Sequence, residues 1–120
     1  MNLRLWPVEM AVYLHRAPVD FRKQINGLAV LVAESMGLDP FKPALYVFSN
    51  RARNRVKVLY WDGQGFCLWL KRLEKHRFVW PLTHEAEVIV LNGDQLHWLI
   101  GGYDIFRFPP HEALEFSAIT

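Results

Sequence analysis

The segment Arg55–Arg72, RVKVLYWDGQGFCLWLKR, constrains the fold of this chain more than any other stretch. Basic and apolar residues alternate at first, Asp62-Gly63 interrupts the pattern, and a second apolar run follows. An Asp-Gly pair between two such runs is one of the stronger signals for an antiparallel hairpin. We therefore expect strands over Arg55–Trp61 and Phe66–Leu73, joined by a tight turn.

Two registers of this hairpin remain open. The central turn residues are either Asp62-Gly63, which pairs Leu59 with Phe66, or Gly63-Gln64, which pairs Trp61 with Phe66. Both registers divide the side chains between the same two faces, because the side-chain period of a strand is two. One face carries Val56, Val58, Tyr60, Cys67, Trp69 and Lys71, and the other carries Arg55, Lys57, Leu59, Trp61, Phe66, Leu68, Leu70 and Arg72. We expect the first face to be the core side, buried by a helix, with Arg55 and Lys57 pointing away from it.

The rest of the chain supplies further strands and two helices. Apolar residues recur every three or four positions after Phe21, which predicts a helix to Met36 with Asp20 as N-cap and Gly37 as the stop. The other predicted elements are strands over Ala11–Ala17, Ala44–Asn50, Arg77–Pro81 and Ala86–Leu91, and a short helix within Asn92–Gly102. The predicted fold class is α+β: an antiparallel meander of about four to six strands, with one main helix and a short C-terminal helix on one side.

The length of 120 residues fits one domain that buries a core without disulfides. We expect this domain to span residues 1–104, with residues 105–120 as a peripheral extension, because Pro109-Pro110 interrupt the tail. A single cysteine, the absence of a signal-peptide pattern and the absence of a long apolar run favour a cytoplasmic protein.

Basic residues concentrate in the middle of the chain. Residues 51–77 hold eight Lys/Arg against two acids, and residues 78–120 hold one Arg against six acids, although the formal net charge is only +2. The hairpin geometry predicts that seven cations gather at one end of the sheet: Arg51, Arg53, Arg55, Lys57, Arg72, Lys75 and Arg77. Such a cluster attracts nucleic-acid phosphates. The alternative is an ordinary solvated face, since charged loops and strand lysines also keep a small sheet soluble.

Aromatic residues near the Asp-Gly turn are candidates for contacts with a partner. Trp61 and Phe66 could stack on bases or bind another protein. No catalytic constellation accompanies them: the acids are scattered among caps and turns, and no pair of histidines has metal-ligand spacing. The sequence therefore predicts no catalytic residue, no metal site and no cofactor.

Two segments carry a family resemblance, Asp20–Val32 (DFRKQINGLAVLV) and Leu45–Pro81. The specific motifs are Asp-x-Arg-Lys followed by Gly-Leu, then Val-Lys-Val-Leu-x-Trp-Asp-Gly, then Lys-Arg-Leu-Glu followed by Arg-Phe-x-Trp-Pro. In order and spacing they resemble the accessory protein of the IS-sixty-six group of bacterial insertion sequences. That protein is encoded by the second open reading frame and labelled TnpB, and is unrelated to the RNA-guided nuclease with the same label. The resemblance covers roughly Val12 to Asp104.

The resemblance implies a role in transposition beside a separate transposase that performs the chemistry. The expected partners are therefore DNA at the transposon ends, the transposase and other proteins of the element. We expect a non-catalytic accessory protein that contacts DNA through its basic hairpin. The alternative is a purely protein-bridging module without DNA contact, in which the aromatic patch or the acidic C-terminal third binds the transposase.

Overall fold

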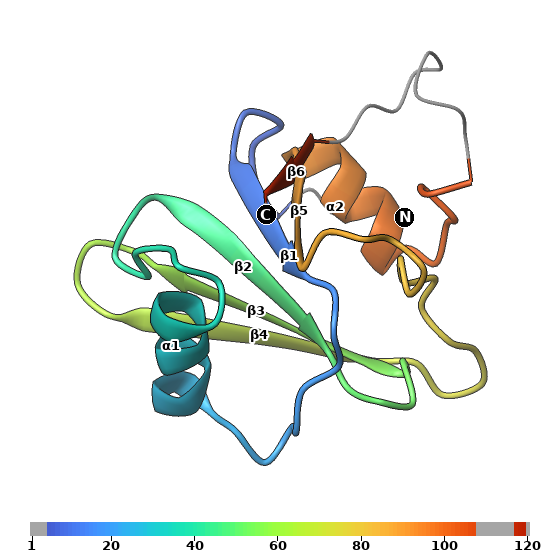
Figure 1. Ribbon diagram of the computed structural model, residues 1–120, viewed down its shortest axis with the longest axis horizontal. Helices are drawn as coiled ribbons and strands as arrows, with labels where there is room; N and C mark the ends of the chain where they lie inside the picture. Colours follow the sequence, from blue (N-terminus) through green and yellow to red (C-terminus); the bar gives the residue numbers. More distant parts are fainter. Residues whose placement is uncertain (1–4, 108–116, 120) are drawn as a thin grey trace.

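The computed structural model describes residues 5–107 and 117–119, which form one six-stranded mixed sheet and two helices (Figure 1). The strand order is β4-β3-β2-β1-β5-β6. The elements are β1 Ala11–His15, α1 Ile25–Glu34, β2 Ala44–Ser49, β3 Arg55–Trp61, β4 Phe66–Arg72, β5 Val88–Leu91, α2 Gly93–Ile100 and β6 Ser117–Ile119. The predicted α+β class and number of strands are confirmed. Neither described helix is long and apolar enough to span a membrane.

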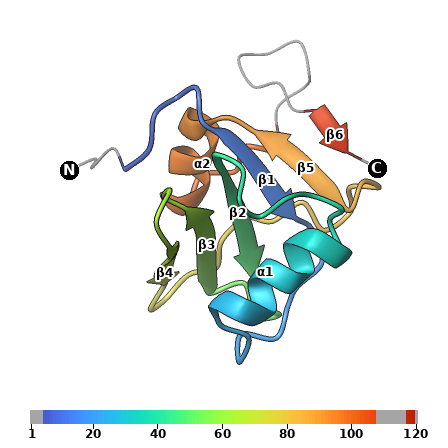
Figure 2. The same ribbon diagram turned by 90° about the vertical axis from the view of Figure 1, so that its left-hand side faces the viewer.

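One pair of neighbouring strands, β1 and β2, is parallel, and the other neighbours are antiparallel. Parallel neighbours need a long crossover connection, which α1 provides across one face of the sheet (Figure 2). The predicted meander is therefore limited to β2, β3 and β4. As a consequence, the carboxyl ends of β1 and β2 meet at the same edge of the sheet.

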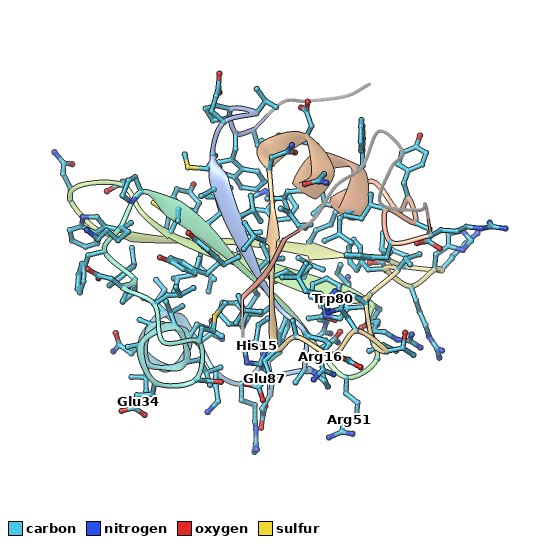
Figure 3. All side chains as sticks on the ribbon, turned by 45° about the horizontal axis from the view of Figure 1, so that its top comes forward. His15, Arg16, Glu34, Arg51, Trp80 and Glu87 are labelled. Carbon is cyan, nitrogen blue, oxygen red and sulfur yellow. The ribbon has the colours of Figure 1, made fainter. Side chains whose placement is uncertain are left out.

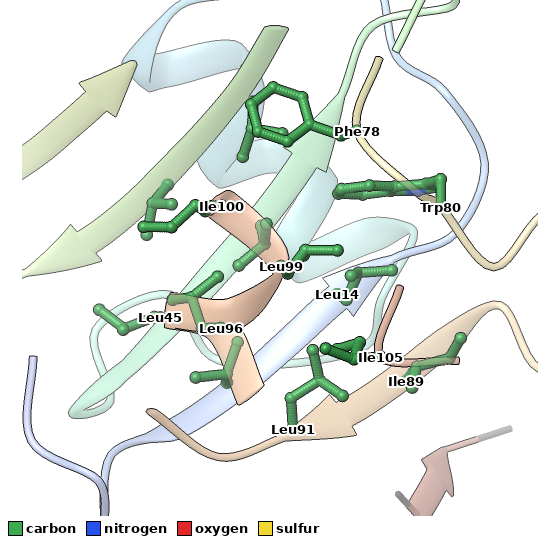
Figure 4. Packing of buried hydrophobic residues seen from close by; sticks show 14 of the residues in the cluster. Leu14, Leu45, Phe78, Trp80, Ile89, Leu91, Leu96, Leu99, Ile100 and Ile105 are labelled. Atoms are coloured by element: carbon green, nitrogen blue, oxygen red, sulfur yellow. The ribbon is translucent and has the colours of Figure 1, made fainter. Parts of the chain in front are cut away.

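The two helices cover opposite faces of the sheet, so the prediction that both lie on one side is wrong. On the α2 face, Val56 and Val58 are fully buried in a cluster that includes Leu96 and Leu99 (Figure 4 shows part of this cluster). On the other face, a second cluster joins Leu28 and Val32 of α1 to residues of β2 and to Leu59. All six residues of β2 are buried, as expected for a strand covered on both faces.

The division of the hairpin into two faces is confirmed, but the helix assigned to them is not. Val56, Val58, Tyr60 and Trp69 pack on the α2 side, whereas the helix predicted to bury them covers the opposite face. Lys57 therefore points toward the segment before α1 and not away from it. Alternation identifies which side chains share a face, but it does not identify the element that covers each face.

The main helix begins later than predicted. Its N-cap is Gln24, and Asp20 instead accepts hydrogen bonds in the turn that precedes the helix. The helix also ends earlier, at Glu34 with Ser35 as C-cap, and not at Met36. Gly37 follows with a φ of +66°, and the Leu38 N–H donates to the Val32 carbonyl over 2.9 Å.

The hairpin adopts the second of the two registers. Trp61 pairs with Phe66 and Val58 with Trp69. The Asp62 Oδ1 atom accepts from the N–H groups of Gln64 and Gly65, each at 2.8 Å, and these bonds close the turn.

The strand predicted over Arg77–Pro81 does not form. This segment passes over the α2 face and inserts Phe78 and Trp80 into the core. The Phe78 N–H donates to the Arg53 carbonyl (2.7 Å), and the Trp80 Nε1–H donates to the Arg16 carbonyl (2.9 Å). Phe78 and Trp80 thus pack in the core and each donate a hydrogen bond, and the segment does not pair with a strand of the sheet.

The predicted boundary after Asp104 stays a prediction. Ile105 is buried in the α2-side cluster, and β6 pairs with β5 at the edge of the sheet. Pro109-Pro110 lie outside the described residues.

Candidate nucleic-acid interface

The strand directions bring several basic segments to one edge of the sheet. β1 and β2 end there, β3 begins there, and β4 ends there, with Arg55 directly opposite Arg72. The loop after β4 lies against the β2–β3 turn, because the Leu73 N–H donates to the Asn54 carbonyl over 2.8 Å and the Phe78 N–H donates to Arg53. We call the basic residues gathered in these segments the basic edge: Arg51, Arg53, Arg55, Arg72, Lys75 and Arg77.

Hydrogen bonds of Asn50 and Asn54 fix the backbone of the β2–β3 turn, which carries Arg51 and Arg53. The Asn50 Oδ1 atom accepts from the N–H groups of both Asn54 and Arg55, each at 3.1 Å, while the Asn50 Nδ2 group donates to the Asn54 Oδ1 atom over 2.7 Å. Arg51 is exposed and extends away from the ribbon in Figure 3. The cations therefore stand on a preorganised turn, which reduces the entropy lost when a ligand binds.

Arg53 has an unusual backbone conformation within this turn. Its φ is +60°, the only positive φ of a non-glycine residue in the described part of the chain. The left-handed region costs a residue such as Arg about 1–2 kcal/mol, and Gly or Asn is the usual occupant. The choice of Arg at this position is not explained by the local fold.

The facing side chains of Arg55 and Arg72 destabilise the sheet. Like charges directly opposite on neighbouring strands are destabilising. Glu74 compensates in part, because its Oε2 atom accepts from the Arg72 Nε–H over 2.8 Å, but this pair is largely exposed to solvent and contributes little. Arg55 and Arg72 are both exposed.

Lys57 does not belong to the basic edge. It is only 4 % exposed, and its Nζ group donates to the carbonyls of Phe21 (3.0 Å) and Lys23 (2.8 Å). The ammonium also lies 4.7 Å from the centre of the Phe21 ring. Burial, and secondarily the charge of Arg55, lower the pKa of Lys57 below its usual value. Lys57 therefore fastens the segment before α1 to the sheet instead of meeting an external phosphate.

The hydrogen bonds of Lys57 hold two further cations near the basic edge, and neither was among the predicted site residues. Arg22 and Lys23 are exposed at the carboxyl end of β1, before the first turn of α1. Arg22 is paired with Asp20, whose pKa is lowered to about 2, chiefly by the hydrogen bond from the Arg22 side chain. The sequence contained a signal for these two residues. The predicted helix placed Arg22 and Lys23 in its first turn, where cations are unfavourable.

The predicted partner residues lie at the opposite end of the sheet. Trp61 and Phe66 are half-buried and form a triangle with Phe41, in which the ring centroids are 5.0–5.1 Å apart. Phe41 is 56 % exposed. We call these three residues the aromatic cluster; Phe41, from the loop before β2, completes it and was not among the predicted contacts.

The described residues contain no group of three or more His, Cys, Asp or Glu side chains that could hold a metal ion. Burial and the neighbouring Asp62 carboxylate raise the pKa of the Cys67 thiol, which lowers the fraction of reactive thiolate. The geometry thus defines a small α+β domain with a basic edge at one end and an aromatic cluster at the other.

Comparison with known proteins identifies the family. Residues 10–109 match the family described as IS66 Orf2 like protein, so the chain belongs to this family, as the sequence motifs indicated. Two proteins of Sinorhizobium fredii (strain NBRC 101917 / NGR234) are similar to it. The uncharacterized protein y4hO is 37 % identical over 108 residues, which cover 90 % of this chain and 86 % of the relative. The uncharacterized protein y4jC is 33 % identical over 90 residues, covering 75 % and 76 %. No solved structure is significantly similar.

Proposed function

We propose that this chain is a non-catalytic accessory protein of bacterial DNA transposition that contacts DNA through the basic edge and assists a separate transposase. Membership of the IS66 Orf2 family links it to insertion sequences and transposition. The observation that carries the DNA contact is the placement of cations where folding does not favour them, namely Arg53 at positive φ and Arg55 opposite Arg72. A bound polyanion would relieve the repulsion between Arg55 and Arg72. A surface that serves only solubility does not require cations at these unfavourable positions.

The proposed contact is with phosphates and not with bases. The basic edge is made of short turns and strand ends, with no exposed helix that could enter a major groove. Arginine side chains can bind phosphate oxygens with two parallel hydrogen bonds, and the rigid β2–β3 turn keeps them close together. We therefore expect weak sequence preference and a steep loss of affinity with salt.

A second candidate function is a protein-bridging module. The aromatic cluster favours it, because Phe41 is more than half exposed at the end of the sheet away from the basic edge. Aromatic residues are enriched at the centres of protein interfaces. The two functions are compatible, since they use opposite ends of the sheet.

Two variants separate these functions. In the first, Arg51→Gln and Arg55→Gln remove two exposed cations, neither of which forms an ion pair within the described part of the chain. In the second, Phe41→Ser removes the exposed ring of the aromatic cluster. We expect the first variant to lose affinity for duplex DNA and to retain binding to the purified transposase, and the second to do the reverse. If the arginine variant binds DNA as tightly as the parent protein but loses the transposase, the basic edge is a protein interface and the proposal is wrong.

A further inference from the structure

Strand β4 forms an open edge of the sheet. β4 pairs only with β3, and it lies at the end of the strand order, as Figure 2 also shows. The strand is seven residues long, and none of its residues is fully buried; Leu70 and Arg72 are exposed, Leu70 to 54 %. A long, open and apolar edge is a template for pairing with another strand.

The hydrogen bonds at both ends of the hairpin identify the backbone groups that face outward. The Asp62 N–H donates to the Gly65 carbonyl, and the Leu73 N–H donates to the Asn54 carbonyl. Hydrogen-bonded pairs alternate along an antiparallel ladder, so the odd-numbered residues of β4 direct their N–H and C=O groups toward β3. The even-numbered residues direct theirs toward the open edge: Phe66, Leu68, Leu70 and Arg72. Among the described residues, no hydrogen bond to these outward backbone groups is present.

The side chains of β4 lack the usual protection against pairing. The first five residues, Phe66 to Leu70, contain no charge, no proline and no glycine, and charges occur only at Lys71 and Arg72. Lys71 is not free to repel an incoming strand at the edge, because its Nζ group donates to the Ile100 carbonyl over 2.7 Å. Natural proteins normally interrupt such an edge with a charge, a proline or a bulge.

We propose that β4 pairs antiparallel with β4 of a second copy of this chain, about a two-fold axis at Trp69. In this register Phe66 pairs with Arg72 of the partner subunit, and Leu68 pairs with Leu70 of the partner subunit. All four outward residues then form hydrogen-bonded pairs. The two sheets become one continuous sheet, with both α1 helices on one face and both α2 helices on the other.

The side chains of β4 favour a second copy and this register, because each cation meets an uncharged residue of the partner strand and not another cation. Arg72 meets an aromatic ring, which attracts a guanidinium, and Lys71 lies opposite Cys67 of the partner subunit. A shift of the register by one step in either direction would leave Phe66 or Arg72 opposite a residue outside β4. In this register all seven residues of β4 are therefore paired with the second copy.

The dimer has a consequence for DNA that rests on the proposed function. The two-fold axis is perpendicular to the sheet, so the basic edges of the two copies face opposite directions. Each copy could then hold a separate duplex, on either side of a strand pair about 23 Å long, at 3.3 Å per residue. The dimer itself is independent of DNA and is tested without it.

The mass of the protein in solution tests the dimer. Sedimentation equilibrium of the DNA-free chain should give twice its mass of 14.1 kDa. Leu70→Lys places a charge at the centre of the proposed interface, on an exposed site that folding tolerates, and should return the mass to that of one chain. Leu82→Lys is the matched control, since Leu82 is 45 % exposed but lies outside β4, and it should stay dimeric. A parent protein that is monomeric at all attainable concentrations, or a dimer that Leu70→Lys leaves intact, would overturn the proposal.

A disulfide tests the register. With the native Cys67, Lys71→Cys should form two disulfides between subunits under mild oxidation, because these positions would form a non-hydrogen-bonded pair with Cα atoms about 4.5 Å apart. The two positions are too far apart on one extended strand to join within a chain. Arg72→Cys is the control: it lies one residue further along, on the opposite face, and should remain uncrosslinked. Equal crosslinking of both variants would refute the register, as would a lack of crosslinking in both.

Discussion

Replacement of the buried Lys57 by Met tests the assignment of this residue to structure and not to DNA contact. Met keeps most of the side-chain volume but removes the ammonium, which donates to the carbonyls of Phe21 and Lys23. Hydrogen bonds from a charged donor contribute about 1.5–3 kcal/mol each. Two opposing effects reduce the loss: Met does not incur the desolvation of a buried charge, and water can reach the two carbonyls in part. We expect a net destabilisation of about 2 kcal/mol, which is within the usual range for a broken buried network.

Urea unfolding followed by tryptophan fluorescence measures this change, and DNA binding is measured in parallel. Lys75→Met is the matched control, because Lys75 is exposed and should change the free energy of unfolding by less than about 0.5 kcal/mol. We expect Lys57→Met to lose stability with an unchanged salt dependence of DNA binding, and Lys75→Met to do the opposite. A stable Lys57→Met protein with a reduced salt dependence would refute the assignment.

Three further predictions concern the turn and two perturbed groups. Arg53→Gly should change the free energy of unfolding by no more than about 1 kcal/mol, because relief of the positive φ offsets the backbone entropy of glycine, yet it should weaken DNA binding; a large loss of stability in urea would contradict this. The Asp20 carboxyl should titrate near pH 2 by NMR, so its contribution to stability is present above pH 3.8 and is lost as the pH falls through about 2; Arg22→Gln should move the midpoint back toward 3.8, and an unmoved midpoint would contradict the pairing. Burial raises the pKa of Tyr46 to about 12, so its contribution is complete below pH 10.0 and is lost as the pH rises to about 12; Tyr46→Phe should reduce this alkaline loss, and an equal loss in both proteins would refute it.

Local signals in the sequence predicted the elements well. The Asp-Gly turn placed β3 and β4, and the apolar run over Ala44–Asn50 identified a buried central strand. Turn and capping chemistry also placed the ends of α2, where Asn92 and Gln95 form a reciprocal capping box. These features depend on neighbouring residues, so a short window of sequence contains the necessary information.

Contacts between segments that are distant in the sequence could not be predicted from such short windows. The burial of Lys57 depends on the crossover that makes β1 and β2 parallel and carries Phe21 and Lys23 over β3. Likewise, Trp80 packs in the core, and its Nε1–H donates to the carbonyl of Arg16, which is distant in sequence. The candidate site was therefore predicted where it depends on the hairpin, as for Arg55 and Arg72, and missed where it depends on the crossover.

The salt dependence of DNA binding tests the central claim most directly. The affinity of the full chain for a duplex from the end of the element is measured by fluorescence anisotropy over a series of salt concentrations, for the parent protein and for a variant with Arg51→Gln, Arg53→Gln and Arg55→Gln. The slope of log affinity against log salt is about −0.9 for each neutralised phosphate, so the loss of three contacts should flatten the slope by roughly 2.7. We predict this flattening, with equal weakening on an unrelated duplex of the same length. An unchanged slope with unchanged affinity would contradict the account and would reduce the basic edge to a solubilising surface.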